Sequence, residues 1–503
     1  MNPAAGWASI ILVSLATAVI GAFGLRISRT TSDFYVASRT VGPMLNASAI
    51  GGEYLSAASF LGIAGLILTY GADMLWYPVG WTAGYLVLLL LVAAPLRRRG
   101  AYTLPDFTEA RLESGHVRRL SSLLVCLIVW LYLMPQFQGA GITLQTVTGA
   151  PSWLGGVVVG AVVLFNAVAG GMRSITFVQA FQYWLKLAAI ALPLIFLVSV
   201  WHRDGAPSVP TNPLPAVDLP SHTLYSTYSL ILATFLGTMG LPHVLVRFYT
   251  NPDGRQARRT TLVVLGLLGQ FYLMPTIYGA LGRIYAPDLA GQDRVVLELP
   301  GRMVAGLGGD LLGSLVAARA FAAFLSTCSG LTVSVAGVLS QDLISRRGAL
   351  RLPGVAAFRV AGCVAVAVPL LLALVGADVP VANAVGLAFA VAASTFCPLL
   401  VLGIWWRGRT ARGASAGLAV GGLLSGFTVI STIATDLGQG WVDTLLAQPA
   451  AWSVPAAFAT MIVVSRATHH RVPAGLSRIM VRLHAPEQID VDRGPEAVRR
   501  SRW

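Results

Sequence analysis

The chain has 503 residues, of which 55% are hydrophobic and only 11% are charged, and its mean hydropathy is +0.71. A soluble domain carries about 25% charged residues, so this composition excludes an ordinary soluble fold and indicates a membrane protein. A net charge of +14 would suggest nucleic-acid binding in a soluble protein. Here the basic residues are divided among separate short segments instead of one continuous face, which argues against that class.

Long apolar stretches with few charges follow one another along the chain. A membrane-spanning helix needs ~20 mostly apolar residues, and by this criterion the sequence predicts thirteen spans. In order, spans 1 to 13 are expected at residues 7–25, 44–70, 74–95, 120–148, 152–170, 175–201, 223–247, 260–283, 311–340, 354–374, 380–404, 414–436 and 450–467. The first lacks the basic start and the cleavage motif of a signal peptide, so we expect it to be retained as a span.

Arginine-rich segments alternate with these spans. If the N-terminus lies outside, the inside loops hold 28 of the 35 basic residues, and the outside loops hold four: Arg203, Arg283, Arg294 and Arg302. Positive charge collects in the cytoplasmic loops of membrane proteins. The sequence therefore predicts a multi-pass protein of the cell inner (cytoplasmic) membrane, with its N-terminus outside and its C-terminus in the cytoplasm.

Spans 2 and 7 share an interruption by glycine and polar residues. Span 2 contains GGEYLS (51–56), and span 7 contains GTMGLPH (237–243). The two spans start five spans apart, so they cross the membrane in opposite directions. Broken helices at matching places in two inverted halves mark the binding site of a secondary transporter. The alternative is that these glycines only allow close helix packing.

The break in span 2 has the chemistry to hold an anion and a cation. Its glycine pair weakens the helix, and Ser56 is a suitable cap for the half that restarts. Main-chain amides would then point into the break and favour an anionic group; these are the amides near Ala57, Ala58 and Ser59. Carbonyl oxygens freed near Gly52 and Leu55 would favour a cation.

Span 9 carries many hydroxyl side chains for an apolar helix: Ser326, Thr327, Ser329, Thr332 and Ser334. Adjacent hydroxyls, together with a carbonyl one turn earlier, offer three oxygen ligands for sodium. The alternative is that small hydroxyl residues join membrane helices to one another.

Charged residues inside a span are costly and usually functional. Glu53 lies at the break of span 2, where it either binds a cation or proton or forms a structural pair that holds the break open. Lys186 in span 6 and Arg319 in span 9 are its candidate partners for charge pairing or gating. Gln136 in span 4 faces either the solute or neighbouring helices.

Five long motifs occur in order between residues 7 and 470: SDFYVASRTVGP (32–43), GGEYLSAASFLG (51–62), GGMRSITFVQAFQ (170–182), GLPHVLVRF (240–248) and LSTCSGLT (325–332). Together they resemble the sodium:solute symporter family. Within that family the chain looks most like the cation–acetate (monocarboxylate) symporters.

The resemblance implies an all-α integral membrane protein with a LeuT-like fold, in which two five-helix repeats are inverted relative to each other. We expect an extra N-terminal helix and loop (1–43), a first repeat of spans 2–6 (44–201), a proline-rich outer loop (202–222), a second repeat of spans 7–11 (223–404), two extra helices (405–467) and an arginine-rich cytoplasmic tail (468–503).

The resemblance and the chemistry of the break together imply the ligands. Sodium would be coordinated by main-chain oxygens of Gly52, Leu55 and Ala323 and by the hydroxyls of Ser326 and Thr327. The solute would be contacted by Ser56, Ala57, Ala58, Ser59, Gln136 and Thr238. Many family members have an aspartate on the cytoplasmic exit route of sodium; this chain has Gln179 there, so we expect that route to differ.

These features predict a secondary symporter that couples sodium entry to the uptake of a short monocarboxylate such as acetate, propionate or pyruvate by alternating access. The alternative is a sodium- or proton-coupled symporter of a neutral or zwitterionic solute such as proline. A membrane sensor or a channel-like module is a third interpretation, and the short tail argues against signalling by this chain alone. The sequence shows no nucleophile–base constellation, so we expect no enzyme. We also expect no organic cofactor, no nucleic acid and no obligate protein partner beside the organic anion, sodium and the lipid bilayer.

Overall fold

The computed structural model describes residues 3–27, 31–56, 58–210, 222–289, 291–345, 354–375, 381–434, 440–473 and 475–486, and every regular element in these ranges is helical. In chain order the α-helices are α1 (Pro3–Ile27), α2 (Thr31–Val36), α3 (Pro43–Tyr54), α4 (Ile63–Tyr70), α5 (Trp76–Val87), α6 (Ala93–Arg99), α7 (Leu104–Leu112), α8 (Gly115–Thr148), α9 (Ser152–Arg203), α10 (Thr223–Gly240), α11 (Pro242–Phe248), α12 (Gly254–Tyr285), α13 (Val295–Met303), α14 (Leu307–Leu339), α15 (Gly354–Val375), α16 (Val381–Trp405), α17 (Ala411–Ala434), α18 (Trp441–Ala447), α19 (Ala450–Ala467) and α20 (Leu476–His484). Short 3-10 or π-helical turns join them: η1 (Ala37–Arg39), η2 (Ala58–Gly62), η3 (Ala72–Leu75), η4 (Leu88–Val92), η5 (Gln292–Arg294), η6 (Ser340–Ser345) and η7 (His469–Arg471).

Nine helices in the described ranges are long and apolar enough to cross a membrane. Two pairs of shorter helices also qualify if each pair is counted as one bent span, which raises the number to eleven. The other two predicted spans coincide with shorter apolar stretches, Gly6–Ala22 and Ser152–Val168. The multi-pass helical architecture is therefore confirmed, but the predicted count of thirteen spans is not.

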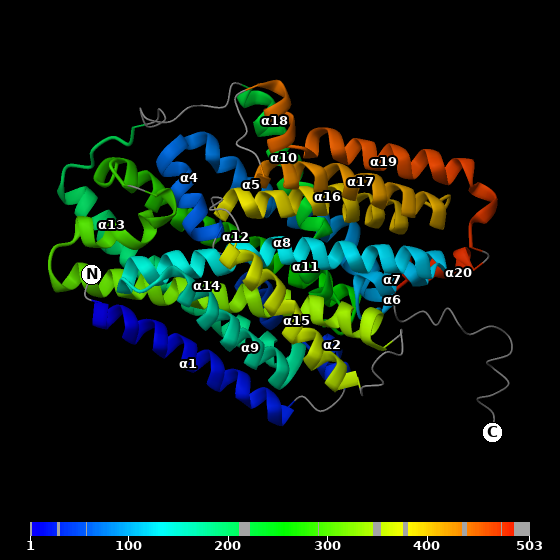
Figure 1. Cartoon of the computed structure of the whole chain (residues 1–503), viewed down its shortest axis with the longest axis horizontal. Helices are drawn as coiled ribbons and strands as arrows, with labels where there is room; N and C mark the ends of the chain where they lie inside the picture. The colour runs from blue at the N-terminus through cyan, green and yellow to red at the C-terminus, as the bar shows by residue number, and fades with distance from the viewer. Residues whose placement is uncertain are drawn as a thin grey trace.

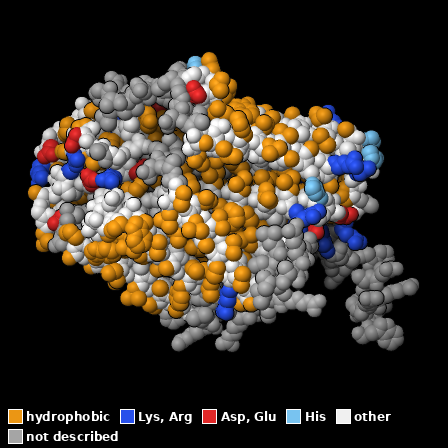
Figure 2. Space-filling model, in the orientation of Figure 1, with side chains coloured by type: hydrophobic (Ala, Val, Ile, Leu, Met, Phe, Trp, Pro, Cys, Tyr) orange, Lys and Arg blue, Asp and Glu red, His pale blue; other side chains and the backbone are white. Residues whose placement is uncertain are grey.

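The surface is that of a protein embedded in lipid. Large hydrophobic side chains such as Leu12, Leu123, Leu371 and Leu423 are more than half exposed. Figure 2 shows hydrophobic side chains across the middle of the molecule and charged side chains gathered toward its two ends. Soluble monomers rarely expose contiguous apolar area on this scale, so this belt is the surface that contacts lipid tails.

α14 is the central helix of the bundle. Its apolar window of 18 residues is completely buried, and the helix packs against α9, α8 and α1 (Figure 1). A helix that is apolar on all sides belongs in the interior of a large helical protein. The hydroxyl-rich stretch of span 9 consequently lies at the centre of the fold and not against lipid.

Both predicted interruptions are breaks in the structure. α3 and the helical segment Ala58–Tyr70 meet at 72°, and α10 and α11 meet at 44°. Pro242 begins α11, a position that proline favours because the first turn of a helix does not use its N–H. α3 packs against α9, and α10 packs against α16. Each broken helix thus packs against a long helix.

α9 joins two predicted spans through a single glycine. Residues 152–203 are helical except at Gly171, whose φ of 56° and ψ of −151° interrupt the helix. Glycine adopts a positive φ at little cost, whereas other residues are strained there. The loop predicted between spans 5 and 6 is therefore reduced to one tight turn, beside which Arg173 pairs with Asp33 at 2.8 Å.

Buried arginines fasten neighbouring helices to one another. Several of them donate hydrogen bonds to main-chain oxygens, including Arg97 to Asn251 and Pro252, Arg111 to Gly403 and Trp406, Arg283 to Ile67 and Leu68, and Arg409 to Leu399. Arg118 pairs within 2.6 Å with three carboxylates, those of Asp106, Glu109 and Asp342. The guanidinium group suits this role because its rigid fork presents five donors. Several basic residues that the sequence assigned to loops are thus structural side chains.

Candidate cation and solute site

α3 ends at Tyr54 inside the bundle and leaves main-chain oxygens without helical partners. The N–H of Leu55 still bonds to the Gly51 oxygen, but helical structure resumes only at Ala58. The last four carbonyls of a helix need other donors. Gly52 brings this helix end against α9, because a Cβ at that position would lie 2.1 Å from the Gln179 main-chain oxygen.

Hydroxyl groups of α14 converge on these oxygens. Ser326 Oγ donates to the Gly52 oxygen at 2.6 Å, and Thr327 Oγ1 donates to the Glu53 oxygen at 2.7 Å. Ala323 is fully buried one turn before Thr327 on the same helix. Of the residues expected to bind sodium, Ser326 and Thr327 therefore contact the end of α3 directly.

A lysine reaches the same place. Lys186 of α9 is fully buried, and its ammonium group donates to the Leu55 oxygen at 3.2 Å and also to the Gly52 oxygen. The sequence suggested Lys186 as a charge partner of Glu53. Instead, its ammonium lies on two of the oxygens expected to coordinate sodium.

Glu53 pairs with an arginine that the sequence placed in a cytoplasmic loop. Arg247 of α11 is fully buried, and its Nε donates to Glu53 Oε2 at 2.7 Å. Its other nitrogens donate to Thr176 Oγ1 at 2.9 Å and to Gln179 Oε1. Gln179 Nε2 in turn donates to the Ser326 oxygen at 2.9 Å. The ion pair thus links the two broken helices, and Gln179 extends the network to α14.

Arg319 is a third buried basic group near the break, and it does not pair with Glu53. Its Nε donates to the Lys186 main-chain oxygen at 3.1 Å, and its guanidinium carbon lies 3.5 Å from the centre of the Phe60 ring. A cation over an aromatic face is stabilised by the ring quadrupole. Within the described residues, Arg319 Nη1 and Nη2 form no hydrogen bond.

Two of the expected solute contacts form hydroxyl pairs beside the break. Ser59 Oγ lies 3.2 Å from the Tyr272 hydroxyl, and Thr238 Oγ1 lies 2.9 Å from the Tyr54 hydroxyl. These pairs connect η2 to α12 and α3 to α10. Both hydroxyl groups of each pair are buried, so they lie inside the bundle at the level of the break.

The remaining expected solute contacts are placed less directly. Ser56 is buried next to Tyr132, and its hydroxyl does not make the expected capping bond within the described residues. Ala58 is fully buried at the start of η2, and Ala57 lies outside the described residues. Gln136 is fully buried on α8, one turn after Tyr132.

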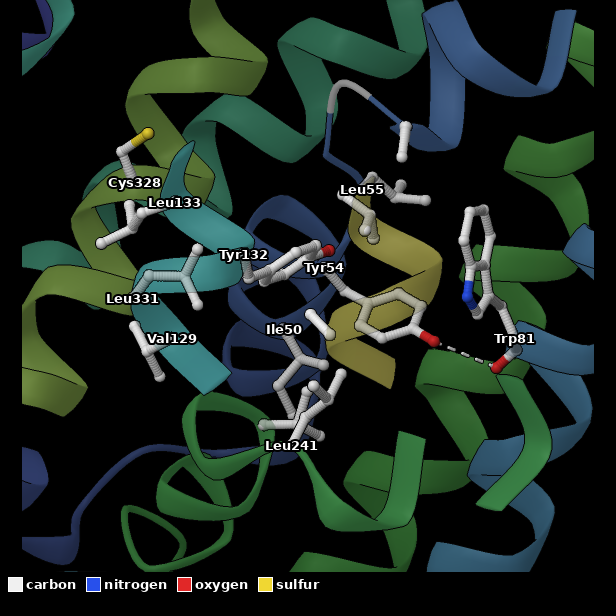
Figure 3. Packing of buried hydrophobic residues seen from close by; sticks show 14 of the residues in the cluster. Ile50, Tyr54, Leu55, Trp81, Val129, Tyr132, Leu133, Leu241, Cys328 and Leu331 are labelled. Atoms are coloured by element: carbon white, nitrogen blue, oxygen red, sulfur yellow. Dashed lines mark hydrogen bonds between the residues drawn. The ribbon is translucent and has the colours of Figure 1, made fainter. Parts of the chain in front are cut away.

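Aromatic side chains that were not predicted as site residues surround the same region. Tyr54 and Tyr85 meet edge to face with ring centres 5.0 Å apart, and the rings of Trp81 and Phe389 are 5.6 Å apart. Figure 3 shows Tyr54, Trp81 and Tyr132 around the end of α3. The signal in the sequence was the aromatic density of residues 76–85, which is equally typical of an interfacial belt.

A cavity of about 610 Å3 is lined by residues of α4, α8, α9, η5 and α15. Its polar lining comes from the ends of α8 and the turn η5, and includes Gln138, Gln145, Gln292 and Arg294. Gln138 is two residues from Gln136 on α8. Residues two apart point to different sides of a helix, and none of the residues that line the cavity is an expected solute contact.

Comparison with known proteins decides the family. Residues 34–421 match the model of the sodium:solute symporter family. The chain belongs to this family. It is 35% identical over 454 residues to the uncharacterized symporter YwcA of Bacillus subtilis (strain 168), and the match covers 86% of each protein. Membership of the family supports sodium-coupled symport as the activity and makes the chain a transporter, not an enzyme.

Solved transporter structures share the fold. A Na+-coupled sialic acid symporter in a substrate-bound, outward-open state has a TM-score of 0.72 and 14% identity, with 91% of this chain and 98% of that chain covered. Mhp1, a nucleobase-cation-symport-1 family transporter, has a TM-score of 0.56 and 16% identity, with 90% and 99% covered. The predicted LeuT-like fold is thereby confirmed.

Proposed function

We propose that this symporter couples sodium entry to the uptake of a short monocarboxylate such as acetate, propionate or pyruvate by alternating access. Sodium would bind at the end of α3, to main-chain oxygens of Gly52, Leu55 and Ala323 and to the hydroxyls of Ser326 and Thr327. The solute would bind beside it, against Ser56, Ala57, Ala58, Ser59, Gln136 and Thr238.

The observation that carries the proposal is a surplus of positive charge at the break. The basic side chains of Lys186, Arg247 and Arg319 are fully buried there, and in the described part of the chain the one ion pair among them joins Arg247 to Glu53. Unpaired buried charge is strongly unfavourable, so an anion next to Lys186 and Arg319 would be stabilised. These side chains support an anionic solute, although the sequence had suggested that main-chain amides of the broken helix would favour it.

The surrounding side chains favour a small solute. Tyr54, Tyr85, Trp81 and Phe389 form closely spaced ring pairs with centres 5.0 and 5.6 Å apart. Ligand sites of this kind combine apolar walls with a few placed polar groups. A short aliphatic chain with one charged end suits such walls better than a long or highly polar molecule.

A zwitterionic solute such as proline is the second candidate, and one observation favours it. Glu53 Oε1 is buried and accepts no hydrogen bond within the described residues. The ammonium group of a zwitterion would supply that bond while its carboxylate faced Lys186 or Arg319. Competition for uptake separates this solute from a monocarboxylate.

We also propose the topology suggested by the sequence, in the cell inner membrane with the N-terminus outside and the C-terminus in the cytoplasm. Residues 44–201 and 223–404 would form the inverted repeats, flanked by 1–43, 202–222, 405–467 and 468–503. The packing of α3 on α9 and of α10 on α16 supports this division, because the first helix of each repeat would then contact its last.

The test is uptake of labelled acetate into proteoliposomes with an inward sodium gradient, with potassium as the control. We expect sodium-dependent uptake that unlabelled propionate and pyruvate inhibit and that proline does not. Sodium-dependent uptake of proline but not of acetate would replace the proposed solute. Acetate uptake that is independent of sodium would contradict the coupling.

A further inference from the structure

We infer that the Lys186 ammonium group and sodium compete for the same main-chain oxygens, so that Lys186 acts as a tethered cation that fills the sodium site when no ion is bound. The inference rests on the sodium site of the proposed function and adds a residue that regulates it. An ammonium group and a sodium ion are both compact monovalent cations that bind oxygen. The two cannot contact the same pair of carbonyls at once.

The contacts of Lys186 support this competition. Its ammonium bonds to the oxygens of Gly52 and Leu55, and Ser326 Oγ shares the Gly52 oxygen at 2.6 Å. Lys186 is fully buried, and Leu55 is 1% exposed. The ammonium therefore lies among the groups expected to coordinate the ion.

The ion-free protein needs such a group. Gly52 and Leu55 are buried in the structure, and buried carbonyl oxygens without hydrogen-bond donors are unfavourable. In the structure the Leu55 oxygen accepts a hydrogen bond from Lys186. The Lys186 ammonium thus donates hydrogen bonds to the carbonyl oxygens at the break during the part of the transport cycle in which no sodium is bound.

When sodium displaces the Lys186 ammonium from the carbonyls, Glu53 offers it a second hydrogen-bond acceptor. Glu53 directly follows Gly52, whose oxygen Lys186 contacts, and Glu53 Oε1 accepts no hydrogen bond within the described residues. The four-carbon stem of lysine is flexible enough to move a charge over a short distance. Sodium entry would therefore transfer the ammonium from the carbonyls of α3 to the free oxygen of Glu53.

The competition also couples sodium to the solute. With Glu53 already paired to Arg247, sodium would join Lys186 and Arg319 as a further positive charge at the break. Like charges in a low-dielectric interior repel strongly. A bound monoanion lowers that repulsion, so sodium and the anion would each favour binding of the other.

The test compares sodium binding by the purified full-length protein and two variants in the absence of solute. Lys186→Met keeps an unbranched apolar stem but removes the ammonium, and Lys186→Gln is a second neutral variant that carries the test if the first is not recovered folded. Binding is followed by tryptophan fluorescence as sodium chloride replaces choline chloride. In both variants we expect the sodium concentration at half-saturation to fall at least about tenfold, which corresponds to ~1.4 kcal/mol of binding free energy.

Arg319→Met is the matched control. It removes a neighbouring buried positive charge but leaves the Lys186 ammonium on the carbonyls of α3. A much smaller shift in Arg319→Met than in Lys186→Met supports competition. An equal shift in both would mean that only the loss of charge matters, and it would overturn the inference. Unchanged or weaker sodium binding by both Lys186 variants would overturn it as well.

Failure of this inference is distinguishable from failure of the proposed function. Sodium-driven acetate uptake by the wild type, together with unchanged sodium binding in the Lys186 variants, contradicts the inference alone. If the wild type does not take up acetate but the Lys186 variants bind sodium more tightly than the wild type, the competition is supported. Only the identity of the solute is then contradicted. Absence of sodium binding from the wild type and from both Lys186 variants contradicts both proposals.

Discussion

Glu53 at the end of α3 and Arg247 on α11 form a buried ion pair with an N–O distance of 2.7 Å, although 194 positions separate them in the chain. Neither side chain is more than 2% exposed. The pair connects the two broken helices directly. A change in the geometry of one break must therefore be transmitted to the other.

Removal of one partner of this pair is expected to destabilise the protein severely. Arg247→Met would remove the guanidinium that pairs with the Glu53 carboxylate, and removing one partner of a buried ion pair costs ~3–5 kcal/mol. Thermal unfolding in detergent measures the effect, and the double variant Glu53→Gln/Arg247→Met should recover part of the loss. Arg359→Met is the control because Arg359 is exposed. A loss in Arg247→Met no larger than in this control would contradict the prediction.

Loss of the α14 hydroxyls is expected to weaken sodium coupling. Ser326→Ala and Thr327→Ala each remove a group that now bonds to the end of α3. A hydrogen bond contributes ~1 kcal/mol. We therefore expect the sodium concentration that gives half-maximal uptake to rise about fivefold for each variant. Ser329→Ala is the matched control, because its hydroxyl bonds at 2.6 Å to the Leu325 oxygen of its own helix. A similar rise in Ser329→Ala would exclude a specific role for the other two hydroxyls.

Gly330 is expected to tolerate no side chain. A Cβ at this position would lie 2.1 Å from Glu53 Cδ, whereas a Cβ at Gly266 would meet no atom within 4 Å. Gly330→Ala should therefore cost ~1–3 kcal/mol through overpacking and should impair sodium-dependent uptake. Gly266→Ala should be neutral or stabilise by up to ~1 kcal/mol, because alanine favours the helix. Equal melting temperatures for the two variants would argue against close packing of α14 on the break.

Asp293 on η5 should make stability depend on pH. Burial raises the pKa of its carboxyl, and a hydrogen bond from the Val381 N–H partly opposes that shift. A raised folded-state pKa means that its contribution to stability is complete below the ordinary pKa and is lost as the pH rises through the folded value. Asp293→Asn should therefore melt higher than the wild type at neutral pH, and the difference should shrink on acidification.

The control for this pH dependence is Asp288→Asn. Asp288 is exposed and pairs with Arg302 at 2.6 Å, and this pairing lowers the pKa of its carboxyl. Its replacement should not raise the melting temperature at neutral pH. A melting difference between Asp293→Asn and the wild type that stays constant from acidic to neutral pH would contradict the role assigned to Asp293.

The breaks were predictable from the sequence because their causes are local. The glycine pair before Glu53 and the run Gly240-Leu241-Pro242 act on the backbone where they stand. Lys186 was also noticeable as a charge within a span. Its contact with the Leu55 oxygen was not predictable, because it depends on how closely Gly52 lets α3 approach α9.

Arg247 was misplaced for a physical reason. It precedes a polar run that contains Arg255, Arg258 and Arg259, and a pattern of this kind is typical of a cytoplasmic loop. Its burial follows from the bend between α10 and α11, which turns the side chain toward Glu53. The expected pairing of Glu53 with Lys186 or Arg319 failed because local sequence does not specify such distant partners.

The arginines that bond to main-chain oxygens have a consequence for how this chain can evolve. Arg111 counts toward the charge that is expected to orient the protein during insertion, and it also bonds to Gly403 at 2.8 Å and Trp406 at 3.1 Å. Exchange for lysine would preserve the charge that the insertion machinery reads, but a point-like ammonium does not reproduce the two-pronged contact. Selection for membrane orientation and selection for helix packing thus act on the same side chains. If one of the two constraints were lost, the other would still restrict these positions.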